Sequence, residues 1–129
     1  MVDAITTSID GTTRVELVVP ADPQLLRIVR LVASGLASLA SLDLDGVEEV
    51  RVAADELVST LIEVSDGEPV HIRLTITDDV LRLEASTPLA PGATLDVDPM
   101  VDRVLEAVST SHSWRTDDGI AHGIVERER

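Results

Sequence analysis

The residues in this sequence best suited to chemistry are a glutamate and a threonine four positions apart, Glu56 and Thr60. In a helix, a spacing of four places two side chains on the same face, one turn apart. A threonine hydroxyl can ligate magnesium, as it does in nucleotide-binding loops. The alternative is that Glu56 is only a solvated charge on an exposed helix face. What the pair does depends on the elements that position it.

Two long helices are predicted in the first half of the chain. Asp22-Pro23 is a typical helix start, with Asp22 as the N-cap and Pro23 at the first helical position. Asp45 starts the second helix, with Glu48 three residues on as its reciprocal capping partner. Apolar residues at helical spacing form the face expected to be buried in the first helix: Leu25, Ile28, Val29, Val32, Leu36 and Leu39. The second helix carries a separate stripe at the same spacing: Glu49, Ala53, Glu56, Thr60 and Glu63.

Alternating apolar and polar residues predict strands on both sides of these helices. The strands are expected at residues 13–19, 70–77, 81–86, 112–115 and 120–126, and a short helix begins at Asp98-Pro99. Residues 87–97 are expected to form a loop. We therefore predict one α+β domain over residues 1–129, a two-layer sandwich in which helices cover one face of a mostly antiparallel sheet. Residues 1–12 and 127–129 are expected to be flexible.

Composition excludes several classes of function. The formal net charge is −14, and no lysine is present, so binding to nucleic acid through general electrostatic attraction is not expected. With one tryptophan and no Phe or Tyr, the chain cannot build an aromatic platform for bases. Without cysteine it forms no disulfide or thiolate metal site. The histidines His71, His112 and His122 show no spacing that specifies a metal site, and His71 is expected on the outer face of the sheet without a functional role. We expect no signal peptide and no membrane span, and we expect a cytoplasmic location.

Two phrases carry a resemblance to a known family. They are residues 20–37 (PADPQLLRIVRLVASGLA) and residues 50–63 (VRVAADELVSTLIE). Together with the order of elements, they resemble the serine kinases that act as anti-sigma factors in bacterial stress and sporulation control. The resemblance covers about Thr13 to Arg127. It implies the Bergerat-type ATPase fold that this family shares with DNA gyrase and the histidine kinases.

The resemblance also implies where ATP would bind, and the sequence departs from that pattern. In the family, the glutamate corresponding to Glu56 is the general base, and an asparagine that binds magnesium stands where this chain has Thr60. A family motif, Asp-x-Gly-x-Gly, holds adenine after the third predicted strand, but this chain has only Ser86 and Thr87 to accept a hydrogen bond there. A glycine-rich lid is missing as well. A degenerate ATP site is therefore expected, with no cofactor, or with ATP and Mg²⁺ if the site works.

The resemblance finally implies a role in transcription control. The expected function is that of an anti-sigma-like protein that binds a sigma factor, an antagonist (anti-anti-sigma) protein, or both. Arg27 and Arg30 on the first helix are the candidate contact residues, and the first strand and first helix are candidate homodimer elements. One alternative is an active serine/threonine kinase with Glu56 as the base and Thr60 as the magnesium ligand. Another is an accessory domain that kept the fold and lost both activities.

Overall fold

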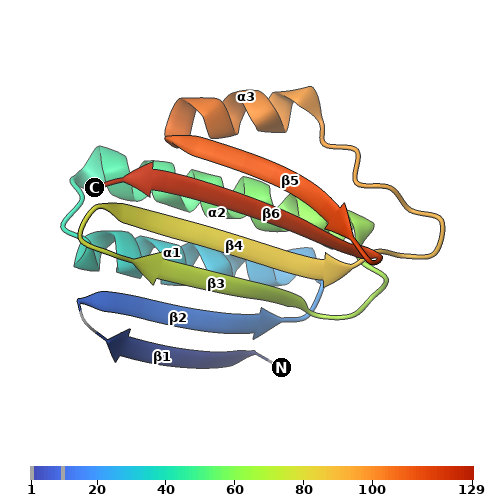
Figure 1. Ribbon diagram of the computed structural model, residues 1–129, viewed down its shortest axis with the longest axis horizontal. Helices are drawn as coiled ribbons and strands as arrows, with labels where there is room; N and C mark the ends of the chain where they lie inside the picture. The colour runs from blue at the N-terminus through green and yellow to red at the C-terminus, as the bar shows by residue number, and fades with distance from the viewer. Residues whose placement is uncertain (1, 10) are drawn as a thin grey trace.

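A computed structural model describes residues 2–9 and 11–129 of the chain, and for residues 5–9 it describes the backbone alone. In these residues it shows one antiparallel sheet of six strands with three α-helices on one side, which confirms the predicted α+β two-layer sandwich (Figure 1). The elements in chain order are β1 (Asp3–Ile9), β2 (Thr12–Val19), α1 (Leu26–Leu39), α2 (Leu44–Val64), β3 (Val70–Ile76), β4 (Val80–Pro88), α3 (Pro99–Val108), β5 (Ser111–Asp117) and β6 (Ile120–Glu128). None of the helices in the described residues is long and apolar enough to cross a membrane.

The sheet has the strand order β1-β2-β3-β4-β6-β5, and every neighbouring pair is antiparallel. Side chains alternate between its two faces because successive residues of a strand point in opposite directions. The inner face is apolar and packs against α1 and α2, which lie behind the sheet in Figure 1. The residues that β2, β3 and β4 bury on this face are Val15, Leu17, Val19, Val70, Ile72, Leu74, Ile76, Leu81, Leu83, Ala85 and Thr87. The outer face carries most of the polar strand residues, and no helix of the described residues covers it.

The helix starts are partly as predicted. The Asp22 carboxylate accepts a hydrogen bond from the Gln24 amide at 2.9 Å, and a short 3₁₀ turn, Pro23–Leu25, leads into α1. For α2 the predicted N-cap was wrong. Asp43, rather than Asp45, has the extended backbone of a cap, and its side chain accepts a hydrogen bond from the Gly46 amide at 2.8 Å.

Both ends of the chain carry regular structure that the sequence analysis did not predict. Strand β1 pairs along its whole length with β2, so regular structure begins at Asp3 and not at Thr13. At the other end β6 continues to Glu128, opposite Val80 of β4. Arg129 then donates hydrogen bonds to the Ala40 carbonyl, from Nη2 at 2.9 Å, and to the Thr77 carbonyl, from Nη1 at 2.8 Å. The last residue thus ties the end of α1 to the β3–β4 turn.

Helix α3 is held to β5 by one carboxylate. It begins as predicted, with the Asp98 side chain accepting a hydrogen bond from the Met100 amide and Pro99 in the first turn. Asp102 Oδ1 lies 2.9 Å from His112 Nε2 and accepts a hydrogen bond from Trp114 Nε1 at 3.0 Å. The indole of the only tryptophan therefore has the partner that a partly buried Trp needs.

Gly123 lies where the sheet and α2 approach closely, and replacing it with alanine should destabilise the fold. A Cβ there would overlap the Leu57 side chain of α2 and lie 2.8 Å from Cζ3 of Trp114. Adding a methyl group to a filled core typically costs about 1–3 kcal/mol. Urea denaturation of Gly123→Ala should therefore show a lower midpoint at an unchanged slope.

Gly35 supplies the matched control for this substitution. It lies in α1, and a Cβ there would meet nothing within 4 Å. Because alanine is the better helix former, Gly35→Ala should stabilise the protein by about 0.5–1 kcal/mol. The two variants should therefore shift stability in opposite directions, and a neutral Gly123→Ala would contradict the packing described above.

Candidate functional site

Glu56 lies half-buried on α2, close to two other carboxylates. The pKa of Glu56 is raised, first by burial and then by the negative charges of Asp55 beside it and of Asp98 at the start of α3. Asp55 in turn pairs with Arg30 of α1, at 2.6 Å between Oδ1 and Nη1. Glu56 thus has an environment in which a carboxylate holds its proton more readily than in water.

Thr60, one turn further along α2, is buried and turned onto its own helix. Its side chain is 8% exposed, and its hydroxyl donates a hydrogen bond to the Glu56 carbonyl oxygen at 2.8 Å. Threonines inside helices commonly satisfy their hydroxyl in this way. The two residues therefore share a face, as the spacing predicted, but the Thr60 hydroxyl is engaged with the helix backbone.

Ser86 and Thr87 of β4 lie on opposite faces of the sheet. Thr87 faces inward and is 1% exposed, and its hydroxyl lies 3.0 Å from Ser65 Oγ and 3.3 Å from the Pro69 carbonyl oxygen. Ser86 is on the outer face, away from the helices. The four residues that the family resemblance assigned to ATP are consequently not brought to one place.

The segment between β4 and α3, most of which was predicted to be a loop, is fixed to the body of the protein. Its first residues are held by backbone hydrogen bonds, from the Leu89 amide to the Gly119 carbonyl at 2.8 Å and from the Ala90 amide to the Val64 carbonyl at 3.0 Å. Leu89 and Leu95 pack against the core. This segment therefore joins the end of α2 to the β5–β6 turn.

The two arginines predicted as partner contacts have different surroundings. Arg27 is exposed on α1. Arg30 is half-buried and forms the ion pair with Asp55 described above, which links α1 to α2. Arg30 is thus engaged within the molecule, whereas Arg27 is accessible to a partner.

Large apolar side chains are exposed on the outward side of α1 and at the start of α2. Leu31 is 69% exposed, Leu39 is 72% exposed, and Leu44 is 88% exposed. The prediction that Leu39 belongs to the buried face of the first helix was wrong, because Ala33, Ala37 and Ala40 occupy that face instead. Leu31, Gly35 and Leu39 follow one another at intervals of four, so they form a stripe along the helix. We call Arg27, Leu31, Gly35 and Leu39 the α1 stripe.

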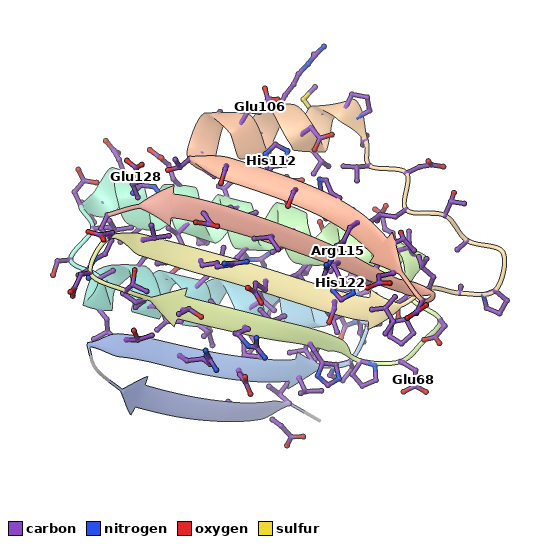
Figure 2. All side chains as sticks on the ribbon, in the orientation of Figure 1. Glu68, Glu106, His112, Arg115, His122 and Glu128 are labelled. Atoms are coloured by element: carbon purple, nitrogen blue, oxygen red, sulfur yellow. The ribbon has the colours of Figure 1, made fainter. Side chains whose placement is uncertain are left out.

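The outer face of the sheet holds a hollow of about 730 Å³ that the sequence analysis did not anticipate. His71, Ser86, His122 and Arg115 stand in one line across β3, β4, β6 and β5, because each is paired with the next in the strand register. Figure 2 shows Arg115 and His122 side by side on the face turned towards the viewer, with His112 separate, beneath α3. Among the described residues, no group of three His, Cys, Asp or Glu side chains could hold a metal ion.

Comparison with known proteins adds no family. No family model matches the chain, and no curated protein matches it either.

The raised pKa of Glu56 gives a pH-dependent contribution to stability. The folded state holds this proton more tightly than the unfolded state, so the Glu56 carboxylate destabilises the fold increasingly as the pH rises through its folded pKa. Glu56→Gln should therefore raise the free energy of unfolding at pH 7, and the gain should shrink as the pH falls towards the ordinary value of 4.5.

Chemical denaturation of the wild-type protein and of Glu56→Gln, at pH values from about 4.5 to 7, measures the difference in the free energy of unfolding. Glu63→Gln is the matched control, because Glu63 lies on the same helix and is exposed. A gain for Glu56→Gln that does not change with pH, or an equal gain for Glu63→Gln, would show that the local charge environment of Glu56 is not its source.

Proposed function

We propose that this chain is a regulatory protein without kinase activity that binds another protein, as the anti-sigma factors it resembles bind sigma factors, and that the α1 stripe is its contact surface. The observation that carries the proposal is the exposure of Leu31 and Leu39, together with Leu44 nearby in the chain. Large apolar side chains gathered on one exposed face are characteristic of protein interaction sites. Their burial in a complex would supply the hydrophobic centre of an interface.

The charge of the protein supports a basic partner. The net charge is −14, and exposed carboxylates stand near both ends of the α1 stripe, Asp22 before α1 and Asp43 and Asp45 at the start of α2. An apolar centre within an acidic rim fits a partner that presents an apolar segment flanked by Lys and Arg. Long-range attraction between opposite charges would also speed the encounter. We therefore propose a sigma factor segment of this composition as the occupant.

The kinase alternative has weaker support. A general base needs its nucleotide and its magnesium ligand close by, whereas Thr60 is buried with its hydroxyl on the helix backbone. Ser86 is across the sheet from Glu56, and the hydroxyl of Thr87 is already within hydrogen-bonding distance of Ser65 and Pro69. The raised pKa of Glu56 is the one feature that favours a base. Burial and the neighbouring negative charges are enough to explain this raised pKa without a catalytic role.

Substitutions in the α1 stripe should weaken binding to the partner without unfolding the protein. Leu31→Ser and Leu39→Ser each remove exposed apolar surface, so each should raise the Kd for the cognate sigma factor roughly tenfold, which corresponds to about 1.4 kcal/mol. Isothermal titration against each purified sigma factor of the source organism measures this. Met100→Ser is the matched control, because Met100 is a 58% exposed apolar residue on α3.

Three outcomes of that experiment would contradict the proposal. One is that no sigma factor binds the wild-type chain. A second is that Met100→Ser weakens binding as much as the stripe variants do. A third is that sedimentation shows a dimer that Leu31→Ser converts to a monomer, with sigma-factor affinity unchanged, which would assign the stripe to a second copy of this chain.

Titration with magnesium ATP separates the regulator from the kinase. We expect no heat of binding up to millimolar ATP, because the residues expected to hold the nucleotide do not converge. Glu56→Ala serves as the control for any heat that is observed. Micromolar affinity that is lost in Glu56→Ala would overturn the assignment of a protein without kinase activity.

A further inference from the structure

The hollow on the outer face of the sheet combines a line of donor side chains with apolar surface. His71, Ser86, His122 and Arg115 lie on four adjacent strands. We call these four residues the donor line. At the usual spacing between strands, the donor line is about 14 Å long. Ile124 and Val18 also line the hollow and add apolar surface beside the polar groups. A volume of about 730 Å³ is within the range of pockets for small molecules.

Most carboxylates of this face are occupied by two arginines. Arg73 lies between Glu16, at 3.1 Å, and Glu84, at 3.6 Å. Arg82 contacts Glu84 at 2.7 Å and Glu126 at 3.9 Å. These groups lie two and four residues along their strands from the donor line, in the next two lines on the same face, where they neutralise one another.

The donor line itself is left with an excess of cationic and neutral donor groups. Among the described side chains, His71, His122 and Arg115 form no ion pair. Asp3, at the β1 edge, is the other carboxylate that lines the hollow, and Asp117 lies two residues beyond Arg115 on β5. Three arginines and two histidines therefore face three carboxylates in the hollow, on a protein whose net charge is −14.

We propose that this hollow binds a small organic anion, with its phosphate or carboxylate group held by the neighbouring Arg115 and His122, while Ser86 and His71 donate to polar groups further along the ligand. Arginine offers planar paired donors to an oxyanion, and the imidazole and hydroxyl groups add further donors along the line. Ile124 and Val18 contact the apolar part of the ligand. An extended polyanion is disfavoured, because beyond the hollow it would meet the acidic surface. This site is on the opposite side of the sheet from the helices and is independent of the proposed function.

The three histidines allow a direct test by NMR. Phenyl phosphate and benzoate, titrated at constant ionic strength, present the two headgroups on the same apolar body. Saturable changes in the ring signals of His71 and His122 are expected with at least one of them. His112 is the internal control, because it lies beneath α3 against Asp102. Inorganic phosphate should bind more weakly than phenyl phosphate if the apolar residues contribute.

Two variants assign the effect to the site. Arg115→Ala should weaken binding at least tenfold, whereas Arg103→Ala, which removes an exposed arginine from α3, should leave it unchanged. The amide spectrum of each variant reports whether it is folded. If Arg115→Ala does not fold, His122→Ala replaces it in the test. The proposal is wrong if neither probe gives saturable changes, if the His112 signals change in parallel with the others, or if Arg103→Ala weakens binding equally.

Discussion

The packing of α2 on the inner face of the sheet is the contact on which the rest of the structure depends. Leu57 of α2 occupies the space that a side chain at position 123 would need, so helix and sheet approach closely at Gly123. With neither Phe nor Tyr in the chain, the core is filled by aliphatic side chains of modest size, and close approach of the layers is how such a core reaches normal density. This contact fixes the rotation of α2. It therefore turns Glu56 towards Asp98 and buries Thr60.

The fold could be predicted from sequence because its signals are local. Alternation identified most strands. Asp98-Pro99 starts α3 as predicted, and Asp22-Pro23 starts the 3₁₀ turn that leads into α1. The strand β1 was missed because its sequence, DAITTSI, has few apolar residues, and its pairing with β2 is visible only in the structure. At the start of α2, Asp43 and Asp45 both suit an N-cap by type, and only the backbone conformation distinguishes them.

The functional surfaces were harder to predict because they depend on rotation and register. Leu39 was assigned to the core because it continues the helical spacing of the apolar residues before it, but the buried residues of α1 are Val29, Ala33, Leu36 and Ala37. Two of these four are alanines, which allow close packing and which the apolar pattern did not single out. His71 and His122 are 51 positions apart and meet across Ser86 through the pairing of three strands. No spacing in the sequence encodes that pairing, so the line of donors could not be found there.

Under the proposed function, the same packing explains how this fold carries a threonine on α2 where the family it resembles has an asparagine. The stability of α2 comes from Ala53, Ala54, Leu57, Val58 and Leu61, which face the core, while Glu56 lies beside them and adds an unfavourable charge. An asparagine at position 60 would have to place an amide where a threonine now satisfies its hydroxyl within one turn of helix. Threonine is thus the residue that suits a buried position, and asparagine the residue that suits a site open to a metal ion. Under the proposed function, selection on the α1 stripe and on the core leaves position 60 free to follow packing rather than chemistry.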